Sequence, residues 1–191
     1  MLSMTRIISG LAGSLKLTSP AKVTRPTSDR IRESIFSRLE SRSVIDGARV
    51  LDLYAGTGAL ALEAASRGAA LAWMVERDGK AAAVCVANLK IVAKALLKEE
   101  VEFDGKVVNK SVSSFLAAPG EIDFNLVFID PPYEITNDEI LADLEALKEI
   151  LKDATVVVER SSRTDAPIWP AGYTLDDEKS YGDTVVYWLS A

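Results

Sequence analysis

An aspartate and two glycines form the first stretch of this chain whose residue types could do chemistry. A short apolar run ends at Asp52, passes through Gly56 and Gly58, and continues into Ala/Leu-rich sequence with helical spacing. This pattern predicts a strand, a tight glycine turn and a helix. Glycine adopts the backbone angles of such a turn and lets a ligand approach closely, and the helix begins with unpaired N–H groups. The stretch therefore predicts a site for a nucleotide or nucleoside.

Two ligands fit this turn. Gly56-x-Gly58-x-x-Ala61 matches the dinucleotide fingerprint, and Glu76, after a second apolar run, could accept hydrogen bonds from ribose hydroxyls in either case. Asp52 favours S-adenosylmethionine, which carries a sulfonium and an ammonium, because a carboxylate is favourable beside a cation and unfavourable beside a pyrophosphate. The alternative without a ligand is an ordinary strand-to-helix turn in an α/β core.

A second motif, Asp130-Pro131-Pro132-Tyr133, follows the apolar run FNLVFI. Its two prolines end a strand abruptly, fix the backbone and supply carbonyls without a competing N–H. Ligands of open α/β sheets bind at the carboxyl ends of the strands, so we expect Asp130 and Asp52 to face one crevice from neighbouring strands. A carboxylate, a rigid carbonyl and an aromatic face could hold a planar ring with an exocyclic amino group. The alternative is a simple turn.

Composition limits the class of protein. The 191 residues are 48% hydrophobic and 26% charged, which is typical of one well-packed domain with a small appendage. No apolar run approaches the roughly 20 residues of a membrane span, and no signal peptide is visible. A single cysteine, Cys85, excludes an intramolecular disulfide, which favours a reducing cytoplasm. Cys85 also lies in a predicted helix and is expected to be a core residue. The absence of histidine excludes Ser-His-Asp and Cys-His sites and His-ligated metals.

The net charge of −6 is unevenly distributed. Residues 1–42 hold eight Lys/Arg and three acidic residues, a charge of +5, whereas the remainder holds 14 basic and 25 acidic residues, a charge of −11. An acidic body with a basic arm indicates that a polyanion docks at the N-terminal end. The alternative is a solvated charged face.

The N-terminal arm is predicted to form a hairpin and a helix. RIISG-LAG-SLKL reads as two short strands around a turn that contains Gly10 and Gly13. Thr27 or Ser28 can cap a helix whose apolar face holds Ile31, Ile35 and Leu39, with Phe36 beside them. This spacing predicts that Arg30, Arg32 and Arg38 lie off the apolar stripe.

Strands and helices then alternate along the chain. We expect strands at 48–53, 70–75, 106–109, 124–129 and 155–159, and helices at 58–67, 80–97, 112–117 and from about 137 to 151. This alternation is typical of a parallel sheet covered on both faces. The ending differs, because GYTLDDEKS and DTVVYWL flank Tyr181-Gly182 as an antiparallel hairpin.

The pairing of DLYAGTGALALEA with DPPY resembles the class I S-adenosylmethionine-dependent methyltransferases that methylate amino groups. RIISGLAGSLKL, RPTSDRIRESIF, LEAASRGA, MVERD, FIDPPYE and YGDT resemble, in the same order, the bacterial RsmD family of 16S ribosomal RNA guanine-N2 methyltransferases. The resemblance implies a Rossmann-like α/β fold with a seven-stranded, mostly parallel sheet and a C-terminal antiparallel hairpin. Residues 1–42 would form an RNA-contacting extension, and residues 43–191 the methyltransferase domain.

The resemblance also assigns roles to individual residues. The cofactor would contact Asp52, Tyr54, Ala55, Gly56, Thr57, Gly58, Glu76, Arg77, Ser111 and Val112. The catalytic residues would be Asp130, Pro131, Pro132 and Tyr133, and the RNA-binding residues Arg6, Lys16, Arg25, Thr27, Arg30 and Arg32. In one departure, Ser111 stands where the family usually has an aspartate near the adenine.

Family membership implies a guanine in 16S rRNA as the target, within an assembling small ribosomal subunit. We expect the enzyme to be a monomer. The Asp130 carboxylate and the Pro131 carbonyl would accept hydrogen bonds from the guanine 2-amino group. Tyr133 would stack on a base that is unpaired or extruded from a duplex. A sulfonium is already a strong electrophile, so this chemistry requires no metal.

Three other functions remain compatible with the motifs. A DNA adenine-N6 methyltransferase uses DPPY equally well, although 191 residues leave little room for a DNA-recognition domain. A protein-glutamine methyltransferase typically has Asn in place of Asp130. A non-catalytic RNA-binding module could keep the fold, but it would have no need for DPPY.

Overall fold

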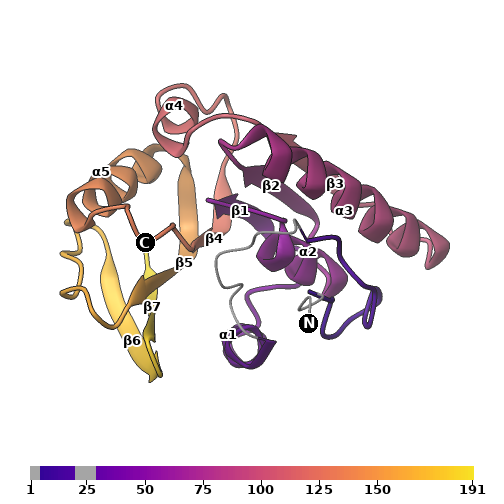
Figure 1. Cartoon of the computed structure of the whole chain (residues 1–191), viewed down its shortest axis with the longest axis horizontal. Helices are drawn as coiled ribbons and strands as arrows, with labels where there is room; N and C mark the ends of the chain where they lie inside the picture. Colours follow the sequence, from indigo (N-terminus) through magenta and orange to yellow (C-terminus); the bar gives the residue numbers. More distant parts are fainter. Residues whose placement is uncertain (1–4, 20–28) are drawn as a thin grey trace.

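The computed structural model describes residues 5–19 and 29–191 (Figure 1). Helices and strands alternate as the apolar periodicity predicts. In chain order the elements are α1 (Asp29–Ser41), β1 (Arg49–Leu53), α2 (Ala59–Ser66), β2 (Leu71–Val75), α3 (Gly79–Lys98), β3 (Asp104–Val108), α4 (Val112–Leu116), β4 (Phe124–Ile129), α5 (Asn137–Leu147), the short 3-10 helix Lys148–Ile150, β5 (Leu151–Ser161), β6 (Thr174–Tyr181) and β7 (Thr184–Ser190).

The strands form one seven-stranded sheet in the order β3-β2-β1-β4-β5-β7-β6. Strands β1 to β5 are parallel to one another, and β7 lies between β5 and β6 and is antiparallel to both. The mostly parallel sheet and its C-terminal hairpin are therefore confirmed. The strand order reverses between β1 and β4, and a ligand crevice is expected at their carboxyl ends.

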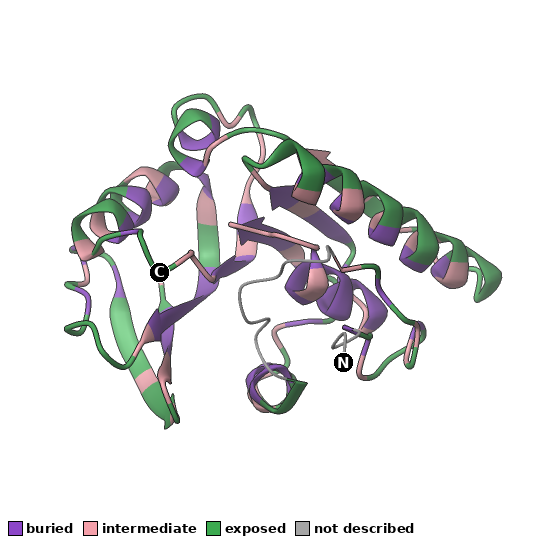
Figure 2. Cartoon of the chain, in the orientation of Figure 1, coloured by how far each residue is buried: buried purple, intermediate pink, exposed green. Residues whose placement is uncertain are grey.

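Helices cover both faces of the sheet, which explains why the central strands are apolar on both sides. One core cluster packs α1, α2 and α3 against one face, where Val50 and Phe128 point. The other packs α4 and α5 against the opposite face, where Leu51 and Val127 point. Figure 2 shows the buried residues along the central strands and the exposed outer side of α3. Cys85 is a buried core residue of α3, as predicted.

Residues 5–19 form a short hairpin with a single antiparallel bridge between Arg6 and Lys16. The hairpin packs on α2, where the buried Glu63 carboxylate accepts hydrogen bonds from the backbone N–H groups of Ile8 at 2.7 Å and Ser9 at 3.0 Å. At Gly10, which has a φ of +83°, a Cβ would lie 1.9 Å from the Ser66 carbonyl oxygen. The N-terminal hairpin is thus joined to α2 by close contacts that leave no room for a side chain at this glycine.

Helix α1 buries Ile31, Ile35, Phe36 and Leu39, as predicted, whereas both candidate cap residues lie outside the described residues. The prediction that Arg32 lies off the apolar stripe is wrong, because the structure leaves only 1% of this residue exposed. Its Nη2 donates to the Arg6 carbonyl oxygen at 2.8 Å and to Asp29 Oδ1 at 2.7 Å. The guanidinium therefore ties the hairpin to α1.

The remaining differences lie at element ends. Helix α5 begins at a capping box formed by Thr136 and Glu139, and it ends at Leu147, before the predicted end near 151. Strand β5 is longer than expected, since its first residues pair with β4 and its last with β7. Among the helices that the structure describes, none is long and apolar enough to cross a membrane.

Candidate active site

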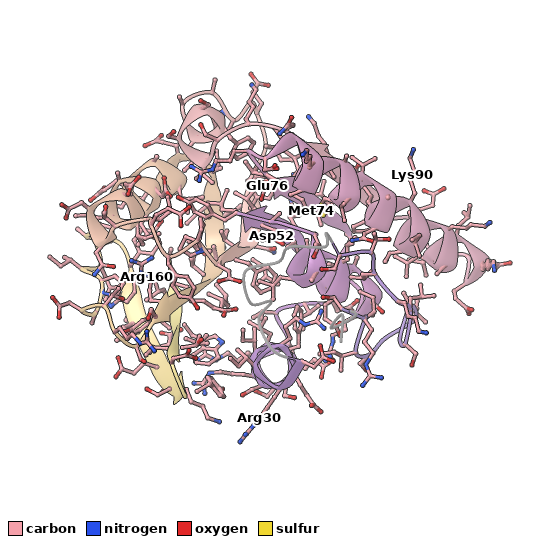
Figure 3. All side chains as sticks on the ribbon, in the orientation of Figure 1. Arg30, Asp52, Met74, Glu76, Lys90 and Arg160 are labelled. Carbon is pink, nitrogen blue, oxygen red and sulfur yellow. The ribbon has the colours of Figure 1, made fainter. Side chains whose placement is uncertain are left out.

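A cavity of about 640 Å³ opens at the carboxyl ends of the parallel strands. Its walls come from the β1–α2 turn, the end of β2, the start of α4, the loop after β4, α5 and the end of β5. The N-terminal part of the chain adds Thr5, Ser19, Ile31 and Arg32. In Figure 3, Asp52 and Glu76 lie near the middle of the molecule, and Arg160 lies toward the β5 side. The crevice expected from the strand order is therefore present.

The β1–α2 turn is built from left-handed backbone at Tyr54, Gly56 and Gly58, with φ angles of +62°, +56° and +80°. Tyr54, Ala55, Gly56 and Thr57 line the cavity. A Cβ at Gly56 would meet no atom within 4 Å among the described residues, so this position leaves open space for a ligand.

Gly58 has a different role from Gly56. It is buried and does not line the cavity. A Cβ there would lie 2.7 Å from Cys85 Sγ and 3.0 Å from Met74 Sδ. The missing side chain of Gly58 therefore makes room for the sulfur atoms of β2 and α3.

Asp52 lies at the base of the cavity and is only 1% exposed. Its Oδ2 accepts a hydrogen bond from the Ala61 N–H at 3.2 Å, whereas Oδ1 is buried without a hydrogen-bond partner in the part of the chain that the structure describes. Burial, with the nearby Asp130 and Glu76 carboxylates, raises the pKa of Asp52 to about 8. A cationic group beside Oδ1 would supply the missing hydrogen-bond donor and would stabilise the ionised carboxylate. Asp52 therefore fits the ammonium of S-adenosylmethionine.

Glu76 connects the glycine turn to the next strand. Its Oε2 accepts from the Gly56 N–H at 2.8 Å and its Oε1 from the Asp78 N–H at 2.7 Å. These bonds fix the carboxylate at the end of β2, where its remaining lone pairs can accept hydrogen bonds from the hydroxyls of a ribose. Arg77, which also lines the cavity, lies 3.4 Å from Glu134 in an exposed ion pair.

Tyr54 is held by a residue that the sequence reasoning missed. Its hydroxyl donates to Asp143 Oδ2 at 2.5 Å, and both side chains line the cavity. Burial and the Asp143 carboxylate raise the pKa of Tyr54, and burial raises the pKa of Asp143. The signal for Asp143 was its place on the apolar face of α5, between Ile140 and Leu144.

Ser111 and Val112 line the cavity at the start of α4. Ser111 caps this helix, because its Oγ accepts from the Ser114 N–H at 3.2 Å. The same hydroxyl donates to Ser114 Oγ at 2.8 Å. The Ser111 hydroxyl, which we expected to contact an adenine, therefore already caps α4.

All four residues of the DPPY motif line the same cavity. The register pairs Leu53 of β1 with Ile129 of β4, so Asp130 follows directly beside the end of β1. The Pro132 carbonyl accepts from the Ile135 N–H at 3.1 Å. No backbone hydrogen bond to the Pro131 carbonyl is found among the described residues. Tyr133 is 64% exposed, which leaves its ring accessible at the rim.

Arg160, at the end of β5, was also missed from the sequence. Its Nη2 donates to the Ile135 carbonyl oxygen at 2.8 Å and its Nε to Asn137 Oδ1 at 3.1 Å. Burial lowers the pKa of Arg160. The side chain therefore anchors the loop between DPPY and α5 to the sheet. Its place directly after a buried strand run was the available signal, shared with its neighbour Glu159.

The residues expected to bind RNA differ in their exposure and in their position relative to the cavity. Arg25 and Thr27 lie outside the described residues. Arg6, Lys16 and Arg30 are exposed and do not line the cavity, and Figure 3 shows Arg30 pointing away from α1. Arg32 is buried and lines the cavity, so its surroundings do not match a solvent-facing phosphate contact.

Two further arginines of the basic arm are engaged within the fold. Arg38 pairs with Asp177 at 2.5 Å and Arg42 pairs with Asp176 at 2.9 Å, both on β6. Arg38 also lies over the Trp188 ring at 4.9 Å. Part of the charge of the arm is therefore neutralised by the acidic body.

Comparison with known proteins gives a consistent family. The family model described as conserved hypothetical protein 95 matches residues 5–190. The chain is 38% identical over 179 residues to ribosomal RNA small subunit methyltransferase D of Escherichia coli strain K12, covering 93% of this chain and 85% of the relative. It is 32% identical to the protein of the same name from Haemophilus influenzae, with 93% and 89% covered. The solved structure of yhhF from Escherichia coli has a TM-score of 0.80 at 34% identity and covers 98% of both chains. The chain therefore belongs to the conserved hypothetical protein 95 family, the RsmD family of class I S-adenosylmethionine-dependent methyltransferases.

Proposed function

We propose that this enzyme methylates the exocyclic N2 of a guanine in 16S rRNA, within an assembling small ribosomal subunit in the cytoplasm. The observation that carries the proposal is that Asp52 and Asp130, at the ends of neighbouring strands, line one cavity. One carboxylate fits a cation and the other fits an amino group. The names of the relatives, which specify small-subunit ribosomal RNA, support RNA over DNA as the substrate.

The cofactor half of the site is formed by Asp52, the glycine turn and Glu76. S-adenosylmethionine, when bound, supplies a methyl group activated by a positively charged sulfonium. Asp52 becomes ionised beside the ammonium, because a neighbouring cation stabilises the carboxylate. Glu76 accepts hydrogen bonds from the ribose, and the open space at Gly56 lets the ligand lie against the main chain.

The substrate half is formed by the DPPY loop. The guanine 2-amino group is a poor nucleophile, because its lone pair is delocalised into the ring. The Asp130 carboxylate and the Pro131 carbonyl accept hydrogen bonds from its two N–H groups, which favours a pyramidal nitrogen and stabilises the positive charge that develops on it. Holding the nitrogen in line for attack supplies much of the remaining rate.

Tyr133 recognises the base by its aromatic face. The ring is exposed at the rim, where stacking on a base contributes about 1–3 kcal/mol. A nucleobase that is paired within a duplex cannot reach the bottom of the cavity, so the target nucleotide must be unpaired or extruded. Arg160 holds the backbone after the motif and so acts as a positioning residue for Tyr133.

The proposal is tested by nucleoside mass spectrometry of rRNA and DNA from a strain that lacks the gene. We expect N2-methylguanosine at one position of 16S rRNA to disappear and to return with the wild-type gene, but not with an Asp130→Ala gene. Unchanged N2-methylguanosine together with a loss of N6-methyladenine from DNA would replace this function with DNA methylation.

A further inference from the structure

Helix α3 carries four lysines and no acidic residue along its 20 residues. This is unusual for the chain, which has 28 acidic and 22 basic residues in total. The lysines, all exposed, are Lys80, Lys90, Lys94 and Lys98. Figure 1 shows α3 reaching the outer edge of the molecule, and Figure 3 shows Lys90 pointing away from the protein. The acidic residues of this region, Asp78 and Glu99–Glu100, lie beyond the ends of the helix.

The four lysines share one side of the helix. At 3.6 residues per turn they fall within an arc of about 80°. The opposite side is buried and holds Cys85, Asn88 and Val92. We refer to the exposed side with its four lysines as the lysine face of α3. Three large apolar side chains border this face and remain partly exposed: Val86 at 38%, Ile91 at 39% and Leu97 at 67%.

This arrangement is unfavourable for the isolated fold. Lysines at i and i+4, such as Lys90 and Lys94 or Lys94 and Lys98, destabilise a helix by about 0.2–0.5 kcal/mol per pair. Surface helices usually relieve such repulsion with acidic partners, yet none of the four lysines forms an ion pair with another described residue. The helix dipole favours Lys98 in the last turn but not Lys90, which lies two turns earlier.

We propose that the lysine face of α3 binds the sugar–phosphate backbone of the substrate RNA at nucleotides remote from the target base. This inference rests on the proposed function. Lysine ammonium groups contact phosphates without reading sequence, which suits a surface that fixes the orientation of a large RNA.

The position of α3 relative to the cavity determines which part of the RNA it reaches. The helix starts beside Asp78 and Ala81, which line the cavity. Lys90 lies 12 residues beyond Asp78, so it is about 18 Å farther along the helix axis. A single strand of about three nucleotides with its target base in the cavity is too short to reach Lys90, whereas a long or folded RNA can extend along the helix.

The lysine face is separate from the basic arm. Figure 3 shows Arg30 and Lys90 pointing out of the molecule on different sides. Arg38 and Arg42 of the arm are already paired with β6, whereas the lysines of α3 lack such partners among the described residues. The charge complementarity of this face therefore favours a second polyanion contact, distinct from that of the arm.

The test compares the double variant Lys90→Glu/Lys94→Glu with the control Lys152→Glu. Lys152 is also exposed, but it lies at the amino end of β5, away from the cavity. Binding is measured with full-length 16S rRNA transcript at several salt concentrations, and with a single-stranded RNA of about three nucleotides that carries the target guanine. For full-length RNA we expect weaker binding and a salt slope lower by about 0.7–0.9 for each phosphate that the variant no longer neutralises. The short RNA and the control variant should show no change.

The melting temperature shows whether the double variant is still folded. In the double variant, repulsion between the glutamates at positions 90 and 94 replaces that between Lys90 and Lys94, and the glutamate at position 94 gains Lys98 as an oppositely charged partner four residues on. The melting temperature of the double variant should therefore be equal to or above that of the wild type. Weaker binding then cannot result from unfolding. The inference would be overturned if the double variant bound full-length RNA with the affinity and salt slope of the wild type. It would also be overturned if the double variant kept its binding to this RNA and lost only binding to vesicles of anionic lipid. If the wild type leaves small ribosomal subunits from a strain without the gene unmethylated, the proposed function fails as well, which distinguishes the two failures.

Discussion

The Tyr54 hydroxyl donates a hydrogen bond to the Asp143 carboxylate at 2.5 Å and so joins the glycine turn after β1 to the middle of α5. Tyr54 adopts a φ of +62°, a left-handed conformation that costs a non-glycine residue about 1–2 kcal/mol. Asp143 is buried, so its carboxyl needs this donor. The hydrogen bond therefore stabilises both the strained Tyr54 and the buried Asp143. The pair lines the cavity between the cofactor half and the substrate half.

Replacing Tyr54 by Phe should lower the free energy of unfolding by about 1–3 kcal/mol, because Asp143 loses its hydrogen-bond donor. Denaturant unfolding measures the change. Tyr133→Phe is the matched control, since that tyrosine is 64% exposed and should leave stability unchanged. Equal stabilities of the two variants would show that the bond to Asp143 contributes nothing.

The raised pKa of Asp52 predicts that the stability of the protein depends on pH. Its pKa is about 8 in the folded protein against 3.8 for the unperturbed group. The folded state therefore binds a proton that the unfolded state has lost, so this contribution to stability is complete below pH 4 and disappears as the pH rises through 8. Asp52→Asn should flatten the decline in unfolding free energy between pH 5 and pH 8.5, measured without ligand. An unchanged decline in the variant would contradict the burial argument.

Arg30 and Arg32 lie two residues apart in α1 but should behave oppositely. Arg32→Ala removes the hydrogen bonds that the buried guanidinium donates to Asp29 and to the Arg6 carbonyl, so we expect a loss of about 1.5–3 kcal/mol of stability. Arg30→Ala should leave stability unchanged and lower the salt slope of RNA binding by about 0.7–0.9. Melting curves and RNA titrations of both variants check this. A stability loss in Arg30→Ala with an unaltered salt slope would move the RNA contact elsewhere.

The two glycines of the turn also form a matched pair. Alanine at position 56 meets no neighbour within 4 Å among the described residues, so its cost to stability should be limited to backbone strain of about 1–2 kcal/mol. Gly58→Ala adds a clash with Cys85 Sγ and should cost more. Adding Cys85→Ala to Gly58→Ala should recover part of the loss. No recovery in this double variant, measured by denaturant unfolding, would exclude the proposed clash.

Local pattern was sufficient to predict most of the fold. The period of the apolar residues identified the strands and helices, and the rule for strand ends placed Asp52 and Asp130 at one cavity. Both predictions depend on interactions that are regular along the chain. The C-terminal hairpin was predictable for the same reason, because Tyr181-Gly182 separates two runs of strand-like sequence.

Residues whose roles depend on distant partners could not be predicted in this way. Arg32 is buried because a carbonyl 26 residues away approaches it, which the helical spacing of α1 does not reveal. Likewise, Asp143 and Arg160 acquire their roles from Tyr54 and from the loop after DPPY. The lysines of α3 were visible in the sequence, but a charge count over residues 43–191 hides them within an excess of acidic residues.

The most direct test of the proposed chemistry is a comparison of methyl transfer and cofactor affinity in Asp130→Ala. The measurement is the rate of methyl incorporation into 16S rRNA, with the affinity for S-adenosylhomocysteine determined by calorimetry on the same preparation. We predict almost no turnover and an affinity equal to or slightly above that of the wild type, because removal of the Asp130 charge eases the ionisation of Asp52. A rate above about a tenth of the wild-type value, a change of less than roughly 1.4 kcal/mol in the barrier, would contradict a chemical role for Asp130.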